Sequence, residues 1–106
     1  MNDERTIPAI AARDERAIRR VMDQYSRLLW SVAGGVLQGV GTEEDLEECV
    51  ADVYVFLWMH PEKFDPLRGS LKRYLAMVAR SRALNRRRQL PRQDALPLDA
   101  LSPSQE

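Results

Sequence analysis

The sequence predicts an all-α domain, a compact bundle of three to four helices. Apolar residues recur at helical spacing in three segments, and no long alternating run of β-branched residues is present. Turn signals rich in glycine or proline separate these segments, at residues 38–41 and 61–69. A chain of 106 residues with 44% hydrophobic residues forms at most one domain with a small core.

Composition divides the chain into three parts. Residues 1–12 are an acidic, polar lead-in that we expect to be loosely ordered, although Pro8 could start a short helix. Residues 13–90 form the helical domain. Residues 91–106 contain three prolines and no helical stripe, which predicts a linker or tail.

The first long helix is predicted from an apolar stripe that follows Asp14, its expected N-cap. The members of the stripe recur with the period of a helix; they are Ile18, Val21, Met22, Tyr25, Leu28, Leu29, Val32 and Val36. Ser26 could divide the stripe into two helices. Gly34 and Gly35 each cost a helix about 1 kcal/mol relative to alanine, so either the helix weakens there or a neighbour packs closely.

Two further helices are predicted around a defined turn. The first begins after Thr42, which forms a capping box with Asp45, and ends before Pro61. Its core stripe is Leu46, Cys49, Val50, Val53 and Leu57. Pro66 and Gly69 define the turn. The last helix is capped by Ser70 and stopped by Pro91, and its core stripe is Leu71, Leu75, Val78 and Ala79.

These two helices carry opposite charge, although the formal net charge of the chain is zero. Six acids and no lysine or arginine lie between Glu43 and Trp58. Eight lysines and arginines and no acid lie between Ser70 and Arg92. Such a pattern predicts two partners, one basic and one polyanionic.

The acidic helix presents a candidate docking surface. Asp45, Glu48 and Asp52 share one face, away from the core stripe, and Val55 and Phe56 flank it one turn later. An acidic ridge beside exposed apolar groups, which here include Phe56 and Trp58, suits a basic partner helix. The alternative is a solvated face that only keeps the helix soluble.

The basic helix offers two neighbouring faces suited to nucleic acid. Arginines recur every seven residues opposite the core stripe, at Arg73, Arg80 and Arg87. The second face combines an aromatic ring, two short hydrogen-bonding groups and a guanidinium, from Tyr74, Ser81, Asn85 and Arg88. Phosphates bind cations, and bases bind stacking surfaces and short donors or acceptors. The alternative is an arginine-rich helix that serves solubility alone.

In this order and register, the two segments resemble region 2 of the sigma-70 family of bacterial transcription initiation factors, most closely the extracytoplasmic-function (ECF) group. The acidic signature of that group matches residues 45–58, and its second signature matches residues 64–88. Identical positions in the second segment include Phe64-Asp65-Pro66, Arg68-Gly69-Ser70, Leu75, Ala79-Arg80, Ala83 and Arg88. The resemblance covers about 75 residues of the chain, from near Arg13 to Arg88.

The resemblance implies a role for each helix. The acidic helix would dock on the β′ coiled coil of core RNA polymerase, with Glu48 and Asp52 as main contacts. Together with the ridge described above, the polymerase-binding set is Asp45, Glu48, Asp52, Val55 and Phe56. The turn and the basic helix would open the −10 promoter element and hold its non-template strand. The DNA-binding set is Arg68, Ser70, Lys72, Arg73, Tyr74, Arg80, Ser81, Asn85, Arg87 and Arg88.

The chain departs from the family pattern at several of these positions. Ala51 replaces a common glutamine, and Phe56 replaces a residue that is usually polar or basic. Among the base-reading positions, Tyr74, Ser81 and Asn85 replace tryptophan, asparagine and aspartate. Region 4, which binds the −35 element in family members, is not expected after Pro91, so the chain resembles an isolated region 2.

An enzyme is not expected, and neither is a metal or cofactor. His60 stands alone before Pro61, Cys49 falls on the core stripe, and no phosphate loop or metal-ligand cluster is present. The single cysteine, the absence of a signal-peptide pattern and the lack of a long apolar run favour the cytoplasm. The alternative function is a helical adaptor or decoy that binds polymerase or an anti-sigma protein without opening DNA.

Overall fold

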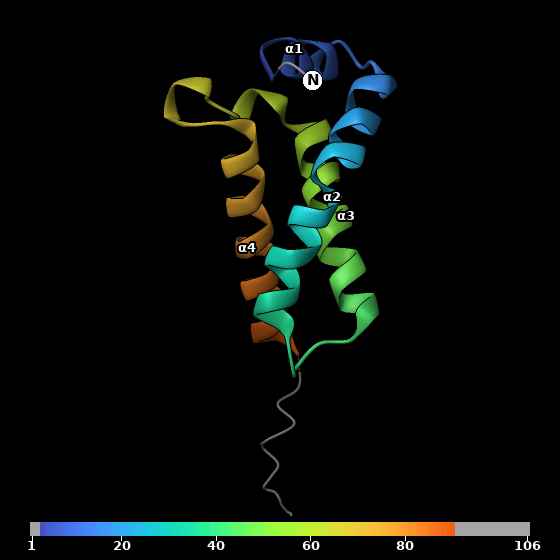
Figure 1. Cartoon of the computed structure of the whole chain (residues 1–106), viewed down its shortest axis with the longest axis vertical. Coiled ribbons are helices and arrows are strands. Elements are labelled where there is room, and N and C mark those ends of the chain that lie inside the picture. Colours follow the sequence, from blue (N-terminus) through green and yellow to red (C-terminus); the bar gives the residue numbers. More distant parts are fainter. Residues whose placement is uncertain (1–2, 91–106) are drawn as a thin grey trace, which may run out of the picture.

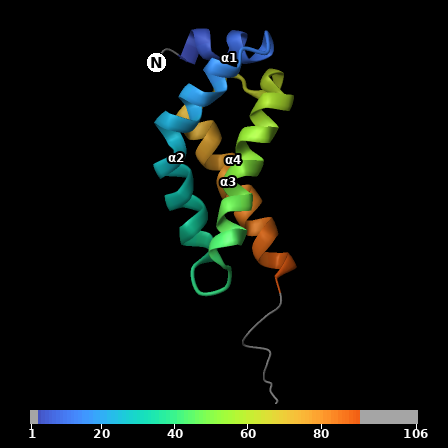
Figure 2. The same ribbon diagram turned by 90° about the vertical axis from the view of Figure 1, so that its right-hand side faces the viewer.

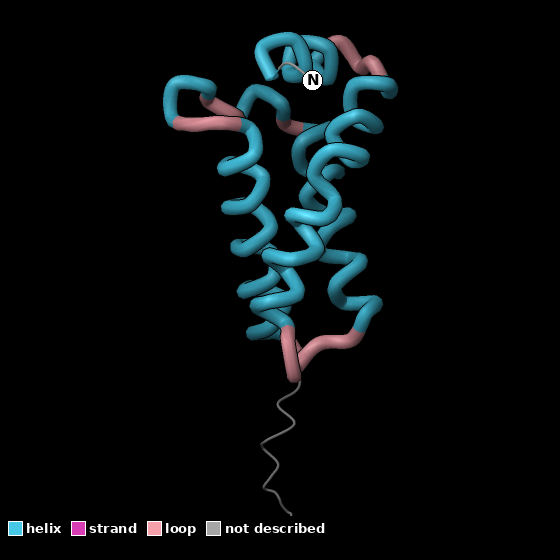
Figure 3. Tube along the Cα trace, in the orientation of Figure 1, coloured by secondary structure: helices cyan, strands magenta, loops and turns pink. Residues whose placement is uncertain are grey.

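The computed structural model describes residues 3–90, which form a helical bundle without a strand. Its elements are α1 (Asp3–Ala11), α2 (Glu15–Leu37), α3 (Glu43–Met59), the 3-10 turns η1 (Pro61–Lys63) and η2 (Pro66–Arg68), and α4 (Leu71–Gln89). The three long helices run along the long axis, and α1 lies across one end of them (Figures 1 and 3). The all-α prediction is confirmed. The tail predicted for residues 91–106 lies outside the described residues.

The core lies where α2, α3 and α4 meet. As predicted from the stripes, α2 packs against both of the other long helices, and Figure 2 shows α4 behind the seam between α2 and α3. The largest side chains with no exposed surface in these three helices are Val21, Leu29, Val53, Leu57, Leu71 and Leu75. Leu46 and Val78, which the stripes placed in the core, lie at its margin, whereas Tyr54 and Ala83 are buried.

The expected break at Ser26 is wrong, because α2 is one continuous helix of 23 residues. The Ser26 hydroxyl bonds to the Met22 carbonyl one turn earlier and shares a 2.7 Å hydrogen bond with the Tyr54 hydroxyl on α3. Both glycines also lie inside the helix. A Cβ atom added at Gly34 would meet Leu46 Cδ2 at 3.9 Å, an ordinary contact, so close packing does not require glycine there. Tertiary packing therefore holds the helix together across its weak positions.

The lead-in is better ordered than the sequence indicated. Helix α1 begins five residues before Pro8 and packs against α2 and η1. Helix α1 confirms the short helix that the sequence allowed in this segment, although it does not start at Pro8. Because Ile10 has no exposed surface, the expectation of loose order is wrong for residues 3–11. Arg13, with a positive φ of 67°, turns the chain into α2. Its guanidinium lies 5.2 Å from the ring centre of Trp58 and donates to the Trp58 carbonyl, which ties this turn to the end of α3.

The helix termini follow the predicted caps. The side chain of Asp14 accepts a hydrogen bond from the Arg16 amide, and that of Ser70 accepts one from the Arg73 amide. Between α3 and α4 the Asp65 carboxylate accepts from the Leu67 amide and so fixes η2. Gly69 follows with φ 148°, a conformation that side chains disfavour. This turn brings the start of the basic helix beside Phe64, which is itself buried in the core.

Candidate functional site

One exposed face of α3 combines acids with apolar groups. Glu48, Asp52 and Val55 are exposed at the spacing of one helix face, as the sequence predicted. Met59 continues this face one turn later, with 57% of its surface exposed against 53% for Val55. We call Glu48, Asp52, Val55 and Met59 the α3 surface. The sequence reasoning did not include Met59, although its spacing from Val55 indicated it.

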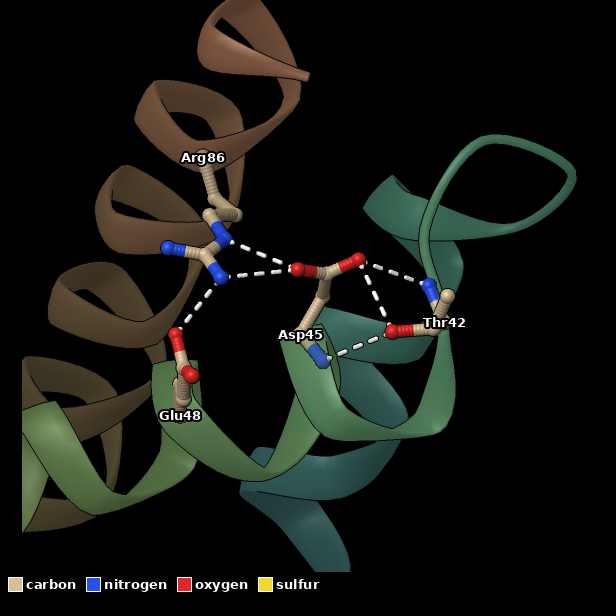
Figure 4. Close-up of polar contacts among 4 residues, drawn as sticks. All are labelled: Thr42, Asp45, Glu48 and Arg86. Atoms are coloured by element: carbon tan, nitrogen blue, oxygen red, sulfur yellow. Dashed lines mark hydrogen bonds and ion pairs between the residues drawn. The ribbon is translucent and has the colours of Figure 1, made fainter. Parts of the chain in front are cut away.

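Asp45 does not belong to this exposed surface, so its expected place on the acidic ridge is corrected. Only 7% of it is exposed. One carboxylate oxygen accepts from the Thr42 amide at 2.8 Å and from the Thr42 hydroxyl at 3.0 Å, completing the capping box. The other accepts from Arg86 Nε and Nη2 of α4, at 3.0 and 2.8 Å (Figure 4). As the N3 residue of the capping box, Asp45 reaches back to the amide of the N-cap Thr42, which is why its carboxylate turns away from solvent.

These contacts hold both partners in their charged forms. The hydrogen bond from the Thr42 amide, followed by that from Arg86, lowers the pKa of Asp45 below its ordinary value. The hydrogen bond to Asp45 raises the pKa of Arg86 in turn. Arg86 Nη2 also lies 2.6 Å from the carboxylate of Glu48, so a single guanidinium joins two acids of α3 to α4 (Figure 4).

Phe56 and Trp58 are half-buried, which corrects the expectation that both are left exposed to water. The Phe56 ring lies 5.3 Å from the His60 ring, and the Arg82 guanidinium of α4 sits 5.0 Å from its centroid. Trp58 packs against the core beneath Arg13. Neither ring is a free apolar anchor, and both already contact a cation.

The arginines spaced by seven on α4 line a groove against α2. Arg73, Arg80 and Arg87 are exposed, as predicted, and they border a hollow of about 650 Å³ that also has apolar lining residues. The apolar lining residues include Val32, Val36, Met77 and Leu84. Arg87 also donates a 3.3 Å hydrogen bond to the Val36 carbonyl near the end of α2. The groove offers three cations at regular intervals along one side of α4.

A second hollow, of about 360 Å³, lies where the turn meets α4. Its walls include the predicted DNA contacts Arg68, Ser70, Arg73 and Tyr74, together with Lys63, which the sequence reasoning missed. Tyr74 is half-buried, and its ring lies 5.3 Å from that of Phe64. Part of the Tyr74 ring is therefore already in contact with protein.

The other predicted DNA contacts extend this basic region along the outside of the bundle. Lys72, Ser81, Asn85 and Arg88 are all exposed on α4. Arg82 and Arg86, by contrast, point to α3. Their spacing from Leu75 and Ala79, at steps of three and four residues, continues the buried seam of α4 and could have indicated this. The helix thus divides its cations between an outward face and α3.

The segment that carries the two adjacent helices of opposite charge and the turn between them lies within the match to a known family. The sequence model of the sigma-70 region 2 family matches residues 21–93 of the chain. The chain belongs to the sigma-70 region 2 family. No curated protein and no solved structure matches the chain. Domains of this family bind core RNA polymerase and recognise the −10 element of promoter DNA, which agrees with the partners expected from charge.

Other kinds of site have little support in the described residues. No helix of residues 3–90 is long and apolar enough to cross a membrane, and no group of three or more candidate metal ligands lies together there. Cys49 is buried, and burial raises the pKa of its thiol, which makes it a core residue of low reactivity. The exposed acids of α3 and the exposed cations of η2 and α4 are therefore the candidate functional surfaces of this sigma-70 region 2 domain.

Proposed function

We propose that this sigma-70 region 2 domain acts in transcription initiation as a domain of the ECF type. In this proposal the α3 surface binds the β′ coiled coil, while the turn and the outer face of α4 open and read the −10 element. The domain has no catalytic role of its own. The observation that carries the proposal is the separation of exposed acids on α3 from exposed cations on η2 and α4.

The composition of the α3 surface supports a basic helical partner. Glu48 and Asp52 supply charge for a lysine- or arginine-rich helix, and Val55 and Met59 supply exposed apolar area beside them. Charge complementarity steers and orients such a complex, and the apolar groups add affinity at its centre. Asp45 does not contact the partner in this proposal. It stabilises the start of α3 through the capping box with Thr42.

The hollow at the turn supports capture of an unstacked base. A base can be read at its Watson–Crick edge only after it leaves the stack. A hollow of about 360 Å³ whose lining includes Tyr74 and Ser70 suits one base. Arg68 and Arg73 stand at the same hollow and can neutralise the adjoining phosphates.

The direct test is a titration of labelled single-stranded and duplex −10 oligonucleotides, followed by fluorescence anisotropy at several salt concentrations. We expect tighter binding of the non-template single strand. Arg80→Ala should weaken all sequences alike and lower the salt slope by about 0.7. Asn85→Ala should change the preference among sequences. Arg20→Ala, on an exposed part of α2 outside both surfaces, is the matched control for loss of one charge.

The polymerase half of the proposal has its own test. A pull-down with a β′ coiled-coil fragment should capture the wild-type domain and lose a Glu48→Lys, Asp52→Lys variant of equal helicity. Added salt should reproduce the loss, because exposed charges are screened. Retention of the variant at wild-type levels argues against docking through the α3 surface.

The alternative is an adaptor or decoy that binds polymerase or an anti-sigma protein without opening DNA. The contact of Tyr74 with Phe64 favours it, because that contact leaves less of the ring for stacking on a base. Equal or tighter binding of duplex DNA in the titration above, together with capture by the β′ fragment, selects this alternative.

A further inference from the structure

Two arginines of α4 contact side chains of the acidic helix α3 in the way expected of a basic partner. Arg86 Nη2 lies 2.6 Å from Glu48 Oε1, an acid of the α3 surface. Arg82 lies 5.0 Å from the centroid of the Phe56 ring, on the same helix. A partner that brings guanidinium groups to α3 therefore meets residues that already bind guanidinium groups of the domain itself.

We propose that Arg82 and Arg86 are internal competitors that attenuate the affinity of α3 for basic partners. The inference rests on the proposed docking of such a partner on the α3 surface. Phe56 lies beside the α3 surface, one helical turn after Asp52. A partner gains less from Glu48 and from the neighbouring Phe56 than it would from free groups, because it must first displace a cation from each. A partner with a single basic residue gains little, so the arrangement favours partners that present several cations at once.

The difference between the two acids makes this competition reversible. The Glu48 side chain is 60% exposed and has one contact with Arg86, whereas the side chain of Asp45 is 9% exposed and has two hydrogen bonds to it. A partner can therefore bind Glu48 while Arg86 keeps its hydrogen bonds to Asp45 (Figure 4). The junction of α3 and α4 is kept while the α3 surface is bound.

The size of the effect follows from the exposure of the pair. Exposed ion pairs contribute little in water, and releasing Glu48 from one such pair should tighten a basic partner by about two- to fivefold. The effect should vanish when Glu48 is absent, since no competition then remains. A purely structural role for Arg86 predicts the opposite sign, because a loosened α3 would bind the partner more weakly.

The test is a double-mutant cycle measured by titration with two probes, the β′ coiled-coil fragment and a synthetic arginine-rich helical peptide. Arg86→Gln should tighten both probes, and it should have no effect in the Glu48→Gln background. Arg82→Gln leaves the contacts of Asp45 intact, so it provides a variant that does not depend on the cap; its effect should vanish in a Phe56→Ala background. Arg20→Gln on α2 controls for the loss of one positive charge, and thermal melts confirm folding.

The outcomes separate the two proposals. If the β′ fragment does not bind while the arginine-rich peptide shows the expected order of affinities, the proposed function fails and the competition stands. If Arg86→Gln and Arg82→Gln both leave the affinity for the probes unchanged or weaker, the competition is overturned. It is also overturned if their gain in affinity only equals the gain produced by Arg20→Gln. Failure of all variants to bind either probe overturns it as well.

Discussion

The hydrogen bond between Tyr54 and Ser26 gives a sharp test of how α2 and α3 are held together. It joins two hydroxyl groups 2.7 Å apart on different helices, and the Tyr54 residue is only 7% exposed. Tyr54→Phe removes this bond but leaves Ser26 with its second partner, the Met22 carbonyl. A neutral hydrogen bond contributes about 1 kcal/mol net to stability. Losing that amount in a domain of this size should lower Tm by about 4–8 °C.

Ser26→Ala should behave differently, although it breaks the same bond. It leaves the Tyr54 hydroxyl buried without this partner, a penalty of about 1–3 kcal/mol. The gain in helix propensity from alanine offsets part of that loss, and Ser31→Ala on the exposed side of α2 measures this gain separately. The double variant should be less destabilised than the sum of the two single variants.

Urea unfolding followed by circular dichroism measures all four species of this cycle. We expect a coupling free energy of about 0.5–1.5 kcal/mol between the two positions. A coupling indistinguishable from zero, or a Tyr54→Phe variant as stable as the wild type, would refute the reasoning. Such a result would mean that the hydroxyl groups bind water in solution rather than each other.

Three further predictions concern the core, the turn and the cap. Leu75→Ala empties a site with no exposed surface and should cost about 2–5 kcal/mol in chemical denaturation; an unchanged unfolding midpoint would contradict the assigned core. Gly69→Ala forces a side chain into φ 148° and should lower the free energy of unfolding by about 1–3 kcal/mol; a variant that unfolds at the wild-type midpoint would contradict this. Because the pKa of Asp45 is lowered in the fold, its contribution is present above its ordinary pKa and is lost as pH falls through the lowered value. An acid titration of Asp45→Asn should therefore show a shallower loss of stability than that of the wild type, and parallel curves would contradict this.

Much of the fold follows from local features of the sequence. The caps at Asp14, Thr42 and Ser70 were predictable because short polar side chains satisfy the free amides of a helix start within three residues. The apolar stripes indicated which face of each long helix is buried, although Met22 of the first stripe is 40% exposed. The opposite charges of α3 and α4 were likewise visible, and with the resemblance they indicated the family that the comparison confirmed.

The sequence by itself did not determine which polar groups would meet across helices. Asp45 and Glu48 belong to one helix and differ by one turn, yet Asp45 is buried against Arg86 while Glu48 stays exposed. The sequence suggested a helix break at Ser26, whereas in the structure its hydroxyl forms a hydrogen bond with Tyr54, 28 residues away. Helical spacing places a side chain on a face within its own helix, but the packing of the bundle decides whether that face meets water, a carboxylate or a guanidinium. Only the tertiary structure therefore divided the cations of α4 between an outward, exposed face and the contacts with α3.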